Sequence, residues 1–135
     1  MPRIFIFATL AMIAAAGSLV AMPVEARARL TGEERLAKLI EGRTAGKPRS
    51  CITTSPSANL TVIDKTALVY KAGGKVWVNR TAHPEDIDDD DILVIRKFGG
   101  SGLCRTDTIT LADRSTGMFT GVIFLDNFVP YEKAS

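Results

Sequence analysis

The stretch Asn59–Arg80 reads NLTVIDKTALVYKAGGKVWVNR and decides the fold. It contains three runs rich in β-branched and aromatic residues, separated by the turn signals Asp64-Lys65 and Gly73-Gly74. Two consecutive glycines supply the positive φ angles of a two-residue hairpin turn, and such a turn fixes the strand register. The predicted cross-strand pairs are Ala72 with Lys75, Tyr70 with Trp77 and Val69 with Val78.

Both faces of this hairpin are apolar. Because side chains alternate along a strand, Leu68, Tyr70 and Trp77 share one face, while Val69 and Val78 share the other. A strand that is apolar on both sides is typical of the middle of a closed or two-layered sheet. The hairpin is therefore predicted to be central.

The N-terminus resembles an export signal. Arg3 precedes an apolar run from Ile4 to Met22, and small residues follow it, so cleavage is expected after Ala26. Residues 1–26 are thus assigned to a signal peptide. The alternative is a retained membrane anchor, because the run is just long enough to span a bilayer.

The charge of the chain argues against general binding of polyanions. The net charge is +2, and loss of residues 1–26 leaves it unchanged because that segment holds one base and one acid. The distribution is uneven, since bases dominate residues 27–49 and acids dominate residues 85–91.

Cys51 and Cys104 are the only two cysteines. In an exported chain an even count predicts a disulfide, which in the chain-entropy model would contribute about 4 kcal/mol for a loop of this length. A redox or metal-binding pair is the alternative, but the chain has no C-x-x-C and a single histidine. No metal or cofactor is expected.

Thr31 and Glu34 form the capping-box pattern T-x-x-E and predict a short amphipathic helix over Gly32–Glu41. The glycine-rich, basic segment Gly42–Arg49 is predicted to be a mobile linker. Residues 27–49 are accordingly treated as a basic helix and linker, and residues 50–135 as a disulfide-closed β domain.

The rest of the chain reads as short strands with frequent turns. A strand is predicted at Ser50–Thr53, and Ser55-Pro56-Ser57 is expected to end it. The four consecutive apolar residues Ile92–Ile95 predict a buried strand. The fold class is α+β and mostly β: an N-terminal helix and a barrel-like or sandwich antiparallel sheet of six to seven strands. Further strands are predicted at Thr106–Leu111, Met118–Leu125 and Phe128–Val129.

The segment from Arg49 to Tyr131 contains several short motifs, each present once: Arg49-Ser-Cys51-Ile52, Val62-Ile-Asp64-Lys-Thr66, Leu68-Val-Tyr70, Val76-Trp-Val-Asn-Arg80, Leu103-Cys-Arg-Thr-Asp107 and Phe128-Val-Pro-Tyr131. In these motifs the chain resembles a family of short, uncharacterised exported bacterial proteins classed as a domain of unknown function. The resemblance implies export to the periplasm and pairing of Cys51 with Cys104. It implies no reaction.

The acidic run Asp86–Asp91 begins like a calcium loop but does not continue as one. Its sixth position is Asp91, where the loop needs glycine, and its twelfth is Lys97, where a glutamate belongs. A looser cation site is the alternative to a solvated acidic loop. His83, the single histidine, has no sequence signal that selects catalytic partners for it, and a surface loop residue is the expected outcome.

The strongest binding hypothesis concerns the hairpin. Tyr70 and Trp77, flanked by Lys71, Lys75 and Arg80, resemble an aromatic and basic face on which rings can stack. A cross-strand core pair is the alternative. Export makes nucleic acid an unexpected ligand and favours a glycan or another envelope component, with membrane contact only through the signal before cleavage.

The sequence therefore predicts a non-enzymatic exported module of the cell envelope that binds a partner or stabilises a complex. The alternative is a small exported hydrolase whose catalytic residues the sequence does not identify.

Overall fold

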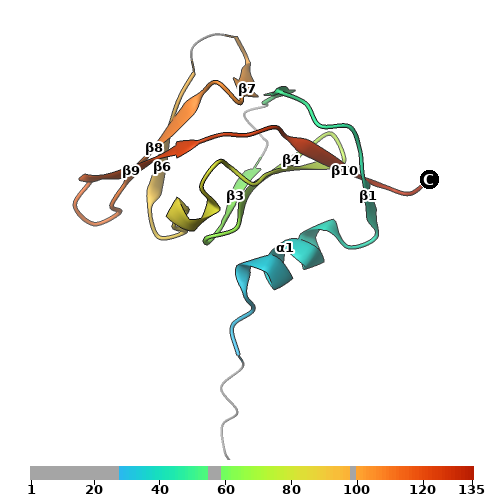
Figure 1. Cartoon of the computed structure of the whole chain (residues 1–135), viewed down its shortest axis with the longest axis horizontal. Coiled ribbons are helices and arrows are strands. Elements are labelled where there is room, and N and C mark those ends of the chain that lie inside the picture. The colour runs from blue at the N-terminus through green and yellow to red at the C-terminus, as the bar shows by residue number, and fades with distance from the viewer. Residues whose placement is uncertain (1–27, 55–58, 98–99) are drawn as a thin grey trace, which may run out of the picture.

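The computed structural model describes residues 28–54, 59–97 and 100–135 (Figure 1). The predicted signal peptide and the break at 55–57 lie outside these residues. The described part is mostly β, as predicted, and it contains no helix long and apolar enough to cross a membrane. In chain order the elements are α1 (Gly32–Ile40), β1 (Arg43–Ala45), β2 (Cys51–Thr53), β3 (Asn59–Ile63), β4 (Ala67–Ala72), β5 (Lys75–Asn79), the 3-10 helix η1 (Pro84–Asp86), β6 (Ile92–Arg96), β7 (Gly102–Cys104), β8 (Thr108–Ala112), β9 (Phe119–Phe124) and β10 (Val129–Lys133).

The strands form three antiparallel sheets. The largest has the order β1-β10-β5-β4-β3, β2 pairs with β7, and the third has the order β6-β8-β9. Across the described residues the sheets do not join into one closed barrel. The described residues form ten strands where six or seven were expected. The strand at Ser50–Thr53 was predicted and is β2, whereas β1 and β7, with three residues each, leave little periodic signal and were not predicted.

The central hairpin is confirmed in its register. Ala72 lies opposite Lys75, Tyr70 opposite Trp77 and Val69 opposite Val78. Gly73 and Gly74 have φ angles of 59° and 76°, which side chains with a Cβ rarely adopt. The two glycines therefore set the pairing of β4 with β5.

Both faces of the five-stranded sheet are covered, which confirms the predicted central position of β4 and β5. Helix α1 lies on one face, below the strands in Figure 1, and Leu36 fills the space between helix and sheet. The core on that side contains Leu36, Ile63, Ala67, Val69, Val76 and Val78. The other face packs against residues of the two smaller sheets in a core that contains Ile52, Leu68, Tyr70, Ile87, Leu103, Ile109, Leu111, Ile123, Leu125 and Phe128.

The capping box of α1 is confirmed. The Thr31 hydroxyl accepts a hydrogen bond from the Glu34 N–H at 3.3 Å, and the Glu34 carboxylate accepts one from the Thr31 N–H at 2.7 Å. Two backbone donors at the start of the helix are satisfied in this way. The helix ends at Ile40, one residue before the prediction, and Gly42 follows with a φ of 68°.

The linker prediction for Gly42–Arg49 is wrong. Arg43–Ala45 forms β1, which pairs with β10, and the Gly46 N–H donates to the Pro130 carbonyl at 2.7 Å. A strand at the edge of a sheet can be held by backbone hydrogen bonds without an apolar pattern, so β1 was not predictable from the periodicity of its residues. β10 also runs through Pro130, where the prediction stopped. Pro130 lies opposite Trp77 of β5, but its carbonyl accepts from Gly46 on the other side, so the missing N–H costs no hydrogen bond to β5.

The expectation that Ile92–Ile95 is buried is also wrong. The segment is a strand, β6, but Ile92 and Val94 are each more than two-fifths exposed. β6 is an edge strand, and these two side chains lie on the face of its sheet that points away from the core. The run of four apolar residues therefore predicted the strand correctly but predicted its burial wrongly.

Cys51 and Cys104 form the expected disulfide. They lie directly opposite each other in the β2–β7 pair, with Cα atoms 4.0 Å apart. The Arg105 N–H donates to the Ser50 carbonyl at 2.7 Å next to the bridge. The disulfide thus fastens β2 to β7 beside the buried core residues Ile52 and Leu103.

Candidate ligand-binding surfaces

A hollow of about 380 Å³ lies beside Trp77, between the β4–β5 turn and β2. Trp77 is half-buried and forms one wall, and the cationic side chains of Arg49 and Lys75 also line it. The remaining lining residues are Cys51, Ile52, Thr53, Ala72 and Gly73. An aromatic wall with two nearby cations is suited to a ring-shaped ligand that carries negative charge.

Tyr70 does not reach this surface. It is 7% exposed and belongs to the core with Leu68 and Ile52, although it lies opposite Trp77 in the hairpin. Of the predicted aromatic pair, only Trp77 is placed to contact a ligand, and Tyr70 supports the sheet from within.

Arg80 points to the opposite face of the sheet from Trp77. Its guanidinium binds the Glu33 carboxylate of α1 at 2.6 and 3.1 Å. This hydrogen bond, more than the charge of Arg80 alone, holds the pKa of Glu33 below its ordinary value and raises the pKa of Arg80. The prediction that Arg80 lies on the same face as Trp77 is therefore wrong. Side chains alternate along a strand, so Arg80 shares the face of Val78 and not that of Trp77.

The structure therefore brings Lys75 and Trp77 together at the hollow, keeps Tyr70 in the core on the same face, and places Arg80 on the other face of the sheet. Lys75 also forms an exposed ion pair with Glu132 at 2.7 Å. Arg49 is the residue that sequence reasoning left out, because it ends a segment read as a linker. Its position two residues before Cys51 was the available signal, since β2, held by the disulfide, lies beside the same hollow as the hairpin.

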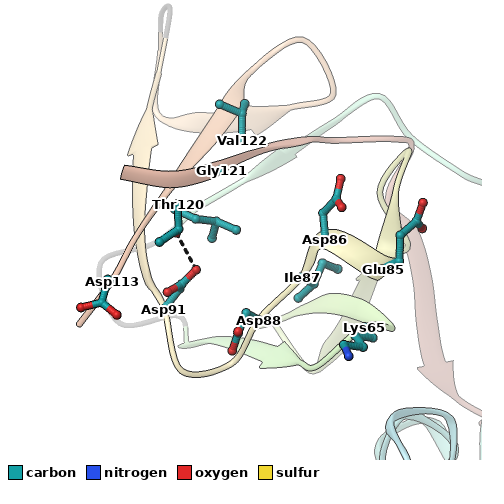
Figure 2. Close-up of a pocket in the computed structure, with 11 residues that line it drawn as sticks. Lys65, Glu85, Asp86, Ile87, Asp88, Asp91, Asp113, Thr120, Gly121 and Val122 are labelled. Carbon is teal, nitrogen blue, oxygen red and sulfur yellow. Dashed lines mark hydrogen bonds between the residues drawn. The ribbon is translucent and has the colours of Figure 1, made fainter. Parts of the chain in front are cut away.

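A second hollow of about 550 Å³ is acidic and lies between η1, the loop before β6 and the β8–β9 hairpin. Figure 2 shows Asp113, Asp91 and Asp88 along one rim, with Asp86 and Glu85 on the 3-10 helix opposite them. Asp91 accepts a hydrogen bond from the Thr120 hydroxyl at 2.7 Å. The other residues around the hollow are Lys65, Ile87, Leu111, Thr120, Gly121 and Val122.

Two carboxylates of the acidic hollow, Asp113 and Glu85, accept hydrogen bonds that favour their charged form. The Asp113 carboxylate accepts hydrogen bonds from the Thr116 N–H, the Thr116 hydroxyl and the Ser115 N–H. These hydrogen bonds lower the pKa of Asp113. Backbone and His83 hydrogen bonds likewise lower the pKa of Glu85. His83 itself lies 3.3 Å from Glu85 in an exposed pair, as expected for a surface loop residue.

The acidic run is also tied to the helix. Arg35 of α1 binds the Asp89 carboxylate at 3.0 Å, and both side chains are partly exposed. Carboxylate oxygens of Asp64, Asp88 and Asp89 lie within 4.8 Å of one another, so Arg35 balances part of a concentrated negative charge. This contact gives the acidic run a structural role in docking the helix.

Comparison with known protein families, curated proteins and solved structures found no match for this chain.

Proposed function

We propose that this protein is an exported, non-enzymatic binding module of the cell envelope that holds an anionic glycan in the hollow beside Trp77. The observation that carries the proposal is the grouping of Trp77, Lys75 and Arg49 around one hollow. A volume of about 380 Å³ is within the usual range of small-ligand sites.

Each part of the hollow has a complementary part in an acidic sugar. The indole ring offers an apolar surface for the C–H face of a pyranose ring, and its N–H can donate a hydrogen bond. Lys75 and Arg49 supply charge-assisted hydrogen bonds to a carboxylate or phosphate, and Arg49 can do so with two parallel donors. The β2 wall of the hollow is fastened by the Cys51–Cys104 disulfide, which limits the ordering cost of binding.

The location fits the same proposal. A disulfide is stable in an oxidising compartment outside the cytoplasm. The apolar run after Arg3 and the resemblance to exported bacterial proteins agree with secretion to the periplasm.

Fluorescence titration provides a direct test, because Trp77 is the single tryptophan. An oligogalacturonate should change the emission of the purified protein, whereas the uncharged oligosaccharide of the same length should bind at least about tenfold more weakly. Lys75→Gln and Arg49→Gln should each weaken oligogalacturonate binding about five- to tenfold.

Lys71→Gln is the matched control. Lys71 is an exposed lysine of the same hairpin, but it shares the sheet face of Val69 and not that of Trp77. It should leave the affinity unchanged. Equal losses in Lys71→Gln and Lys75→Gln, or no response to the acidic sugar, would show that the hollow is not the binding site.

A further inference from the structure

The exposed large apolar side chains of the described residues gather on one sheet. Of seven such residues, six lie on β6, on β9 or directly before β9. They are Ile92, Val94, Ile95, Met118, Phe119 and Phe124. The third sheet, β6-β8-β9, therefore carries apolar surface that the fold itself does not cover.

β6 is an edge strand of this sheet, and one of its sides is open to pairing with another strand. It pairs with β8 on one side, and no other described strand pairs with its second side. An unpaired edge presents a row of backbone donors and acceptors, which proteins usually protect with charge, proline or a bulge. The strand Ile92–Arg96 has no such protection over its first four residues.

The ends of β6 carry opposite charges. Asp88–Asp91 precede the strand, whereas Arg96 and Lys97 end it. A parallel neighbour of the same sequence would place acid beside acid and base beside base. An antiparallel neighbour would place each acidic end beside a basic end, so the edge is complementary to itself in that direction alone.

We propose that β6 pairs with β6 of a second copy of this chain, antiparallel, about a two-fold axis that passes beside Val94. In this register Val94 lies opposite Val94 of the second copy, Leu93 opposite Ile95, and Asp91 opposite Lys97. Apolar residues then meet apolar residues in the middle of the pair, and an acid meets a base at both ends. The two three-stranded sheets become one six-stranded sheet.

This arrangement accounts for the exposure of the strand. Ile95 is 36% exposed although it lies on the core side of its sheet, opposite the buried Ile109, because the edge beside it is open. A second β6 covers that edge and pairs its free backbone groups. The interface is separate from the hollow beside Trp77, so each proposal can fail without the other.

Sedimentation velocity of the purified protein, from about 5 to about 200 μM, tests the pairing. The expected result is a dimer that dissociates on dilution. Val94→Lys places two like charges at the two-fold axis and should raise the dimer Kd at least about tenfold. Phe119→Lys changes a more exposed apolar residue of the same sheet, on the opposite edge strand β9, and it should leave the dimer intact.

A charge exchange tests the register itself. Asp91→Lys and Lys97→Asp should each weaken the dimer, and the double variant should restore most of the lost affinity. Circular dichroism checks that each variant stays folded. A wild-type protein that is monomeric throughout the range would overturn the proposal, as would a dimer that Phe119→Lys breaks and Val94→Lys does not. Association only with lipid vesicles would also overturn it, since that would assign the apolar surface to a membrane.

Discussion

Asn79 and Asp126 are joined by two hydrogen bonds although they lie 47 positions apart. The Asn79 side-chain Nδ2 donates to the Asp126 carbonyl at 2.6 Å, and its Oδ1 accepts from the Asp126 N–H at 3.0 Å. The same Oδ1 accepts from the Thr81 N–H at 2.9 Å. One fully buried amide therefore fastens the turn between β9 and β10 to the end of β5.

Replacing Asn79 with Ala should lower the free energy of unfolding by about 2–4 kcal/mol, because three backbone groups lose their partner at a buried position. Urea unfolding measures the loss. Asn127→Ala, in the same turn, is the control and should cost much less. A similar loss in both variants would mean that the turn, and not the buried amide, carries the stability.

Removal of the disulfide should lower the free energy of unfolding substantially. The Cys51–Cys104 bridge closes a separation of 53 residues, so the double variant Cys51→Ser, Cys104→Ser should lose about 4 kcal/mol by the chain-entropy model. Urea unfolding of the variant, and of wild-type protein with and without a reductant, provides the comparison. An unchanged midpoint would contradict the role of the bridge in holding β2 to β7.

Gly102 faces the backbone of β2 closely. A Cβ at this position would lie 2.8 Å from the Ile52 carbonyl oxygen, which is too close for ordinary contact. Gly102→Ala should therefore destabilise the protein by about 1–3 kcal/mol. In Gly121→Ala the new Cβ would lie 3.8 Å from Leu111 Cδ1, an ordinary contact, so thermal unfolding should change little. The reverse order of the two melting temperatures would contradict the close approach of β2 and β7.

Acid should weaken the attachment of α1 to the sheet. The Arg80 guanidinium lowers the pKa of Glu33, so the folded protein binds this proton less tightly than the unfolded chain does. The resulting stability is present above the ordinary value of 4.5 and is lost as the pH falls through it toward the lowered folded value. The effect is small because both side chains are exposed.

Urea unfolding at about pH 6 and about pH 3 measures this dependence. Glu33→Gln should lose less stability on acidification than the wild type, whereas Glu41→Gln, which removes the same charge at the far end of the helix, should behave like the wild type. An identical pH dependence in all three proteins would show that the Glu33–Arg80 pair does not contribute.

Local patterns predicted the fold where neighbouring residues determine it. The Gly73-Gly74 turn sets the register of β4 and β5, and the capping box sets the start of α1. The disulfide also followed from composition, because only two cysteines are present. These features depend on residues that are adjacent in sequence or have only one possible partner.

Features that depend on distant neighbours were missed. The pairing of β1 with β10 and the exposure of Ile92 are decided by which strands lie next to each other, and short runs do not encode that. The hollow beside Trp77 likewise needs β2 to approach the hairpin before Arg49 can join it. The position of Arg80 was different, since side-chain alternation from Trp77 was enough to place it on the helix side.

The pairing of β1 with β10 has a consequence for how the chain acquires its structure. Synthesis delivers Arg43–Ala45 long before Val129–Lys133, so the partner of β1 and one neighbour of β5 are missing until the C-terminal strand emerges. A nascent chain is therefore left with an incomplete sheet, and a fragment that stops before Val129 should be open to proteases throughout.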